Sequence, residues 1–444
     1  MNIFTRKINF KLVSIIQIIF FILYLTFNIL NVGEMGTALS FLAIFIVLAG
    51  IELFTQIIQV KICIKKHFIF LLLFVVWLSV RVIVDLNDLE HLKQIIIATT
   101  GGILLFFLIG TFIKSAIEKI FLFKKPQIIL EILLLFILAC VLVIFTSLRL
   151  RLVRSDIFYI QDVHGSYQRP GNFLTILFMI LSFIYSMLLS YEYTKKIGSI
   201  LLYSLIYSSA MFFSLISSQL FGSNAATANI LAIYLITIVL AIISSNKKFR
   251  LMYIQKKLRF PNSKKLVMKI IKVSIFIIVV FALIGFAMIK KTGFDLTKTR
   301  AFGFGSGENT SVTSRFNILK ETGIAQMSYA PLLGNVNVAY LTTGNAGRTL
   351  HNLIPNIIAE LGLVGLLIFS LLLISIFRIL LKNIRNKNNS LEGFQKNMTN
   401  YWLFFVLIFL FLYANISVGK SWSVMWFFLG FSVSMFDKKS IINF

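Results

Sequence analysis

A group of polar residues interrupts a long apolar stretch in the last quarter of the chain. Asn352, Asn356 and Glu360 stand at positions i, i+4 and i+8, so a helix places all three on one face. His351 immediately precedes this face. A carboxylate inside a membrane helix is costly unless it faces a polar cavity or a partner, which makes Glu360 a candidate functional residue. The alternatives are that Glu360 is the buried partner of an arginine or serine on a neighbouring helix, and that His351 is an ordinary histidine of an interfacial loop.

Arginines concentrate in two polar segments between apolar runs, residues 147–171 and 290–353. Seven of the 11 basic residues in these segments are arginine. Arginine presents a planar fork of donors that fits phosphate oxygens, whereas lysine is a hydrated point charge. This pattern indicates an anionic ligand, with phosphate or pyrophosphate the natural candidate, and salt bridges between loops are the alternative. The four arginines that we select as candidate ligand residues are Arg154, Arg169, Arg315 and Arg348.

The elements that must position these residues are membrane helices. Hydrophobic residues make up 58% of the 444 residues and charged residues only 13%, whereas a soluble domain carries roughly 25% charged residues. The apolar residues fall in runs of about twenty, the length that crosses about 30 Å of hydrocarbon. Lipid leaves every backbone polar group to be satisfied within such a run, so each run must be helical. We predict an all-α polytopic membrane protein, with residues 1–444 forming a single membrane domain.

The apolar runs predict about twelve transmembrane helices. When the N-terminus is placed in the cytoplasm, 29 of the 43 lysines and arginines fall in inner segments, as the positive-inside rule requires. Both termini are then cytoplasmic, and residues 290–353 form one large outer loop. In that loop residues 314–328 read as an amphipathic helix on the membrane surface, ended by Pro331. The predicted spans are residues 10–30, 36–60, 68–84, 95–113, 127–147, 172–190, 198–219, 224–244, 270–289, 354–381, 401–417 and 421–436.

The net charge of +27 does not indicate a nucleic-acid-binding protein. The basic residues form short clusters between apolar runs, where they set topology and meet anionic lipid headgroups. Cys63 and Cys140 have neither the spacing of metal ligands nor that of a disulfide framework. No cluster of Asp, Glu or His resembles a metal site, so we predict that the protein works without a metal.

Three motifs resemble the O-antigen ligase and polymerase superfamily. His351-Asn352, followed after nine residues by Gly362-Leu363-Val364-Gly365, is similar to its His-Asn…Gly-x-x-Gly signature. The earlier Arg315 and Pro331-Leu332-Leu333-Gly334 are similar to the family's Arg…Pro-Leu-x-Gly approach to the histidine. The resemblance covers residues 315–369 and implies a GT-C-like glycosyltransferase, with its chemistry on the outer, periplasmic or extracellular, face of a bacterial plasma membrane.

Two activities occur in this family. Wzy-type polymerases join oligosaccharide repeats of O-antigen or capsule carried on undecaprenyl pyrophosphate, and ligases move finished polysaccharide to another acceptor. Ligases tend to follow Gly-x-x-Gly with threonine, where this chain has Leu366-Leu367, so the resemblance favours a polymerase. Its implied partners are a lipid-linked oligosaccharide donor and acceptor, membrane lipids, and a chain-length regulator and a flippase of the same pathway. No cofactor is implied.

The resemblance also implies roles for the candidate residues. His351 would take the proton of the attacking sugar hydroxyl, with Glu360 as its orienter or as a rival base. Preorganised arginines would stabilise the charge of the pyrophosphate leaving group, and Asn352 and Asn356 would bind substrate. A flippase or transporter of lipid-linked sugars is the alternative from another class. It fits less well, because the predicted spans contain few ionisable residues.

Overall fold

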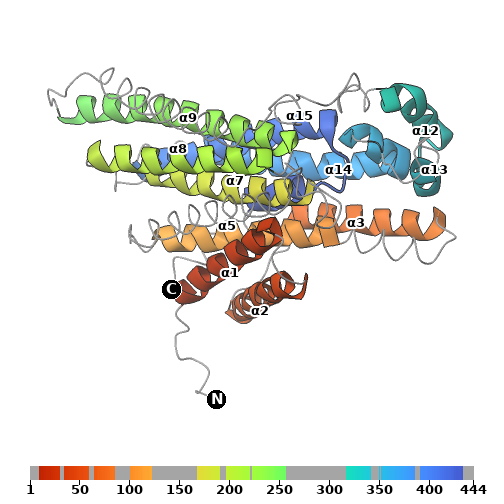
Figure 1. Ribbon diagram of the computed structural model, residues 1–444, viewed down its shortest axis with the longest axis horizontal. Helices are drawn as coiled ribbons and strands as arrows, with labels where there is room; N and C mark the ends of the chain where they lie inside the picture. The colour runs from red at the N-terminus through yellow and green to blue at the C-terminus, as the bar shows by residue number, and fades with distance from the viewer. Residues whose placement is uncertain are drawn as a thin grey trace, which may run out of the picture. The chain divides into compact units, whose positions relative to one another are not determined.

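The computed structural model describes residues 10–30, 35–59, 65–85, 101–122, 168–190, 197–220, 223–256, 317–341, 350, 352–385 and 391–433. Every regular element in these ranges is a helix (Figure 1). The chain divides into two compact units, which are described separately. The first unit comprises residues 1–46, 119–305 and 383–406, and the second comprises residues 47–118, 306–382 and 407–444.

The helices follow the apolar runs. Six of them contain stretches that are long and apolar enough to cross a membrane, so the chain is an α-helical multi-pass membrane protein. The predicted spans 127–147 and 270–289 lie outside the described residues. The six stretches are Leu12–Ile29, Lys66–Asp85, Arg169–Leu189, Asn224–Ile243, Leu353–Arg385 and Met398–Ile416.

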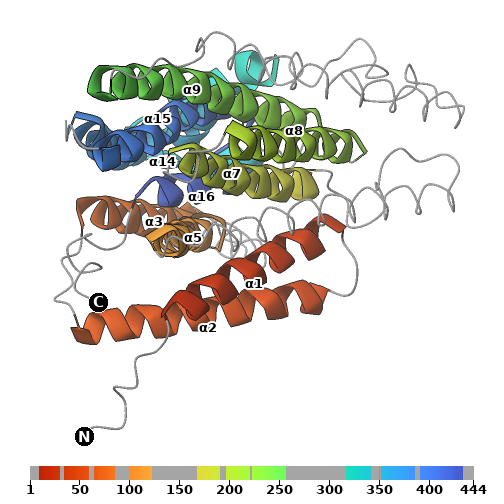
Figure 2. The same ribbon diagram turned by 90° about the vertical axis from the view of Figure 1, so that its left-hand side faces the viewer.

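The first unit is built around α1 (Phe10–Leu30), α7 (Gln168–Ser190), α8 (Ile197–Leu220) and α9 (Asn224–Lys256). The helices α7, α8 and α9 lie side by side (Figure 2). Their shared interface carries hydroxyl pairs, which satisfy polar side chains between membrane helices. These pairs are Tyr185–Ser204, Tyr207–Ser182 and Tyr234–Ser208, at oxygen–oxygen distances of 2.8, 2.8 and 3.1 Å.

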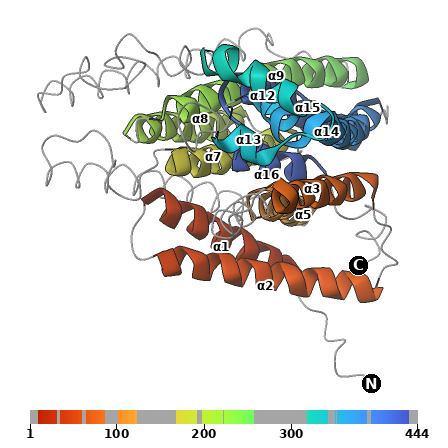
Figure 3. The same ribbon diagram turned by 90° about the vertical axis from the view of Figure 1, so that its right-hand side faces the viewer.

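The second unit contains α3 (Lys66–Asp85), α5 (Phe106–Leu122, which extends past the unit boundary), α14 (Leu353–Arg385) and α16 (Ser423–Ser432). Figures 2 and 3 show α16 between α14 on one side and α3 and α5 on the other. The short helices α12 (Ile324–Tyr329) and α13 (Val336–Leu341) lie at the end of α14 where that helix begins (Figure 3). The remaining helices are α2 (Met35–Gln59) and α15 (Leu391–Ser417), and each of them has residues assigned to both units.

Four helices differ markedly from the predicted spans. α9 continues to Lys256, past the predicted end at residue 244, and α15 begins at Leu391, before the predicted start at residue 401. α16 has ten residues where residues 421–436 were predicted, and about 15 Å of helix is too short to cross the hydrocarbon. It is fully enclosed by protein from Val424 to Val433, which is where non-spanning elements are tolerated. α5 extends to Leu122, past the predicted end at residue 113, because lysine, alanine and glutamate sustain a helix after the apolar run ends.

Backbone contact between α5 and α16 depends on two glycines. A Cβ added to Gly110 would overlap the Phe427 carbonyl oxygen, and one added to Gly430 would overlap the Phe107 carbonyl oxygen. Small residues of this kind allow membrane helices to approach closely. We expect Gly430→Ala to destabilise the protein by about 1–3 kcal/mol, the typical cost of overpacking. Thermal unfolding in detergent measures this, with Gly50→Ala as the control, because nothing lies within 4 Å of a Cβ at Gly50.

The predicted amphipathic helix at residues 314–328 is observed from Asn317 to Tyr329, just before Pro331. Its protein-facing side carries Ile318 and Met327, which pack against Ala339, Leu350 and Ala359. Ile324 is 62% exposed. The side of this helix away from the protein is mixed, because Lys320, Glu321 and Ser328 are exposed there too.

Candidate functional site

The predicted polar face of α14 is present and buried. Asn352, Asn356 and Glu360 are 8%, 1% and 3% exposed. The Asn356 side-chain N–H donates to Glu360 Oε1 over 2.5 Å, which is the contact that i, i+4 spacing allows on a helix. The sequence pattern therefore identified this face correctly.

The last turn of α15 and the connection from α15 to α16 form hydrogen bonds with this polar face. The Asn352 amide donates to the Asn415 carbonyl oxygen over 2.7 Å, and the Ile354 backbone N–H donates to Asn415 Oδ1 over 3.1 Å. The Lys420 backbone N–H donates to Asn356 Oδ1 over 3.1 Å. Two segments about sixty residues apart in the chain are thus joined by polar contacts inside the second unit.

Glu360 pairs with Lys420. The Lys420 ammonium donates to Glu360 Oε2, and the two side chains are only 5% and 4% exposed. The alternative interpretation from sequence, a buried partner on another element, is therefore what the structure shows, although the partner is a lysine rather than an arginine or a serine. Since both carboxylate oxygens accept hydrogen bonds, Glu360 is held in place beside Asn356, as a positioning group would be.

A second feature of the site is a break in α14 at Gly362, which has φ +68° and ψ −170°. Such a break leaves backbone N–H groups beyond it without partners on their own helix. The N–H groups of Leu363 and Val364 donate instead to the carbonyl oxygens of Pro331 and Leu332, over 2.9 and 3.2 Å. Residues 331–332 therefore supply the acceptors for the first two N–H groups after the break.

Gly334 and Gly362 pack backbone against backbone at this break. Gly334 also has a positive φ, of 72°. A Cβ on Gly334 would overlap the backbone of Glu360, Leu361 and Gly362, and a Cβ on Gly362 would overlap Leu332 and Gly334. Positive φ and close backbone approach are both conditions that favour glycine. The Pro-Leu-x-Gly and Gly-x-x-Gly motifs are thus in direct contact.

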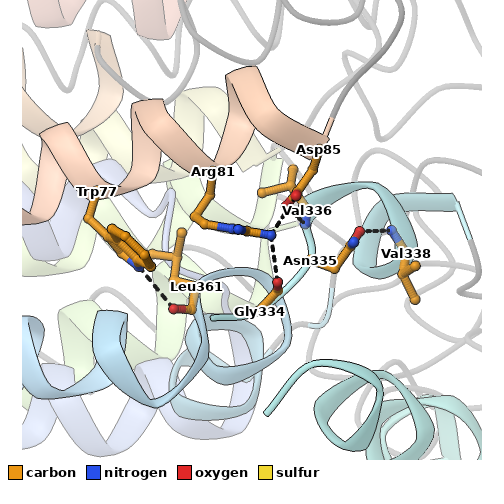
Figure 4. A network of polar contacts seen from close by, with 8 residues as sticks. All are labelled: Trp77, Arg81, Asp85, Gly334, Asn335, Val336, Val338 and Leu361. Atoms are coloured by element: carbon orange, nitrogen blue, oxygen red, sulfur yellow. Dashed lines mark hydrogen bonds and ion pairs between the residues drawn. The ribbon is translucent and has the colours of Figure 1, made fainter. Parts of the chain in front are cut away.

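The end of α3 binds the same segment (Figure 4). Arg81 donates to Asp85 Oδ1 over 2.5 Å and to the Gly334 carbonyl oxygen over 2.8 Å. Asp85 Oδ2 accepts the Val336 backbone N–H over 2.8 Å. One turn before Arg81 on α3, the Trp77 indole N–H donates to the Leu361 carbonyl oxygen over 3.0 Å. We call these three α3 residues, Trp77, Arg81 and Asp85, the α3 clamp.

Among the predicted arginines, Arg169 is described. It lies at the start of α7 in the first unit and donates to Asn28 Oδ1 over 2.7 Å. Its guanidinium carbon stands 5.9 Å from the centre of the Phe173 ring, a cation–π contact. The other predicted site residues, His351, Arg154, Arg315 and Arg348, lie outside the described residues.

Sequence reasoning missed Lys420 and the α3 clamp. Lys420 stands between two apolar runs and was counted only as one of the outer topogenic charges. Arg81 and Asp85 stand at the end of an apolar run, where charged residues are ordinary. Their i, i+4 spacing was a usable signal for a helical ion pair, but nothing in the local pattern pointed to Gly334.

No metal centre is found among the described residues, where no group of three or more His, Cys, Asp or Glu side chains could hold an ion. The absence of a metal from the reaction stays a prediction. The polar groups gathered at α14 are amides, one carboxylate and one ammonium, and these bind and orient ligands through hydrogen bonds and charge.

Comparison with known proteins gives no relative for this chain. No protein-family model matches it, and neither does any curated protein or solved structure. Any assignment of function therefore rests on the motif residues and on the geometry of the second unit.

Proposed function

We propose that this protein is a membrane glycosyltransferase that polymerises oligosaccharide repeat units carried on undecaprenyl pyrophosphate, as a member of the O-antigen ligase and polymerase superfamily. The observation that carries this proposal is the contact between Gly334 and Gly362. The two glycines come from separate motifs of the resemblance, and the tertiary structure gives both the same positive φ and the same need for a missing side chain. Motifs matched by chance have no reason to meet in this way.

The topology that accompanies the proposal has a cytoplasmic N-terminus and about twelve membrane helices, of which α16 is too short to span by itself. It is supported by the six apolar stretches long enough to span and by the concentration of lysine in the segments assigned to the inner side. This topology puts the start of α14, the α3 clamp and residues 290–353 at the outer face of the plasma membrane. A lipid-linked pyrophosphate would present its sugar at that boundary.

The proposed reaction needs a base and an anion site. The acceptor hydroxyl oxygen attacks the anomeric carbon of the donor, the bond from that carbon to pyrophosphate breaks, and the pyrophosphate leaves with the electron pair. His351 takes the hydroxyl proton. Arg315 and Arg348, which belong to the same unit as His351, stabilise the leaving charge. Because the bond to pyrophosphate supplies the driving force, the transfer uses no ATP.

The described contacts change the role that we propose for Glu360. A carboxylate that already accepts hydrogen bonds from Lys420 and Asn356 is a poor rival base. We therefore propose that Glu360 holds the start of α14 in position, next to His351 and Asn352. Asn352 keeps its proposed substrate role through its side-chain oxygen, which is buried and has no hydrogen-bond partner among the described residues.

Removal of the proposed base tests the function. We expect His351→Ala to slow the extension of a purified lipid-linked repeat by about 10²–10⁴-fold, the usual contribution of a general base. Extension is followed by gel separation of the lipid-linked products, using protein reconstituted in vesicles. His91→Ala is the matched control, since it removes a histidine from a different polar segment with no assigned role. Full activity of His351→Ala would contradict the assignment.

The same assay separates the other candidate functions. Transfer of the glycan to a separate acceptor, without growth on the polyprenyl lipid, would identify a ligase. Movement of the lipid-linked repeat across the vesicle membrane with no new glycosidic bond would identify a flippase. Either result would replace the polymerase proposal.

A further inference from the structure

The turn between α12 and α13 is apolar and exposed. Tyr329 and Leu332 are each 64% exposed, Leu333 is 48% exposed, and Pro331 is exposed as well. We call residues 329–333 the apolar turn. A contiguous exposed patch of large nonpolar side chains marks a surface that meets another nonpolar phase. The position of this turn along the neighbouring membrane helices decides whether that phase is lipid.

The backbone of the apolar turn is fixed to α14 at a known residue. Its Pro331 and Leu332 carbonyl oxygens accept the N–H groups of Leu363 and Val364. The turn therefore lies at the level of Leu363 along that helix. Leu363 is the first residue after the break at Gly362, so the turn lies beside the beginning of the second stretch of α14.

The lipid-facing surface of α14 begins at that level. No residue from Asn352 to Gly362 is exposed. Beyond the break, exposed residues recur on one face as far as Leu381, and all are apolar except Arg378. The rise from Leu363 to Leu381 is about 27 Å, close to the thickness of the hydrocarbon core, and a long arginine side chain near the far end of such a helix can reach the headgroups. Leu363 thus stands at the edge of that core. The residues of this stripe are Leu363, Leu367, Leu371, Ile374 and Leu381.

α3 gives independent evidence that the apolar turn lies at the edge of the hydrocarbon core. Its exposed apolar residues run from Ile69 to Val84, and the helix ends at Asp85 after about 30 Å. Arg81 and Asp85 at this end hold Gly334 and the Val336 N–H, which directly follow the apolar turn (Figure 4). Two helices therefore place the turn at the boundary between hydrocarbon and headgroups.

We propose that the apolar turn docks into the leaflet of the membrane on its own side, with Leu332 and Leu333 among the acyl chains and Tyr329 at the headgroups. Tyrosine suits that position because its ring is apolar and its hydroxyl is wet. The turn continues the lipid-facing stripe of α14, which is why lipid is its occupant rather than a soluble partner. It is the turn, and not the mixed outer face of the preceding helix, that makes this contact.

Docking would connect the bilayer to the candidate site. The turn is followed directly by Gly334, which packs against Gly362, and its carbonyl oxygens complete the break in α14. Lipid contact at the turn would therefore help to hold the two motifs together. This inference rests on the membrane location of the chain and not on the proposed glycosyl transfer.

Spin labels at the turn test the proposal. Leu332→Cys and Leu333→Cys are made in the full chain with Cys63→Ser and Cys140→Ser, reconstituted in phosphatidylcholine vesicles. Collisions with oxygen, which concentrates in lipid, are compared with collisions with a polar nickel chelate, which stays in water. We expect the ratio of oxygen to nickel collisions at both positions to approach that of Leu363→Cys. The ratio should exceed that of Glu321→Cys, an exposed position on the preceding helix, by several-fold.

Each other outcome overturns the proposal. A ratio equal to that of Glu321→Cys would place the turn in water. A label shielded from both reagents would show that protein, such as a second copy of this chain, covers the turn. Because both leucines are exposed, their replacement removes no core packing, and an unchanged elution profile in detergent verifies the fold. The spin-label result does not depend on catalysis, so inactivity of the His351→Ala variant would not change it.

Discussion

A Lys420→Met variant is expected to lose about 3–5 kcal/mol of folding free energy, the usual cost of removing one partner from a buried ion pair. The remaining Glu360 carboxylate would be an uncompensated charge that is 3% exposed and faces the interior of the second unit. The variant would also lose the link between the α15–α16 connection and α14. Thermal unfolding in detergent, followed by the loss of monodisperse protein, measures the effect.

A double variant separates charge from packing. In Lys420→Met with Glu360→Gln, the amide oxygen of the glutamine can still accept from Asn356, and no charge is left buried. We expect the double variant to recover much of the lost stability, because apolar or neutral replacement of a whole buried pair is often tolerated. Lys320→Met, at an exposed lysine, is the matched control and should change little. Equal stability of the single and double variants would show that the pair is not what Lys420 supports.

Substitution of Gly362 is expected to have the second large effect. Gly362→Ala forces a side chain into a positive φ, which costs about 1–3 kcal/mol, and adds a Cβ where the Leu332 and Gly334 backbones lie. We expect the segment of residues 324–341 to separate from α14, with a lower melting temperature and loss of glycan extension. Limited proteolysis between residues 324 and 341 would report the separation directly.

Two further variants identify the cause of the Gly362 effect. Gly334→Asn keeps a residue that tolerates positive φ, but its Cβ would still overlap the backbone of residues 360–362. We therefore expect Gly334→Asn to be as damaging as Gly334→Ala. Gly102→Ala is the control, since the nearest atom to its Cβ would be the Ser421 carbonyl oxygen at an ordinary 3.7 Å. Rescue by asparagine would show that conformation, and not close approach, is what these glycines provide.

The local pattern of apolar residues was enough to predict most of the helices in the described residues. Apolar runs such as 10–30 and 224–244 became α1 and α9, because a membrane helix satisfies its backbone within its own run. The same local logic placed Asn352, Asn356 and Glu360 on one buried face, since 3.6-residue periodicity depends on nothing outside the helix. These features follow from neighbours three or four residues apart.

Features that depend on distant partners could not be predicted in this way. The length of α16 depends on how other helices enclose it, and hydropathy alone cannot distinguish an enclosed helix from a spanning one. Gly362 lies inside an apolar run that reads as unbroken helix. It breaks because Pro331 and Leu332 supply the carbonyl oxygens that the break requires.

The sequence by itself determined that this is a helical membrane protein, and it identified the polar face and the glycine motifs that any site on α14 would use. Only the tertiary structure decided what those residues contact. It paired Glu360 with Lys420, packed Gly334 on Gly362, and brought Arg81 to the same loop segment. The physical reason is that a helix is specified by short-range hydrogen bonds and by the periodicity of its own residues. The role of a buried charge or of a glycine depends instead on which distant segment packs against it.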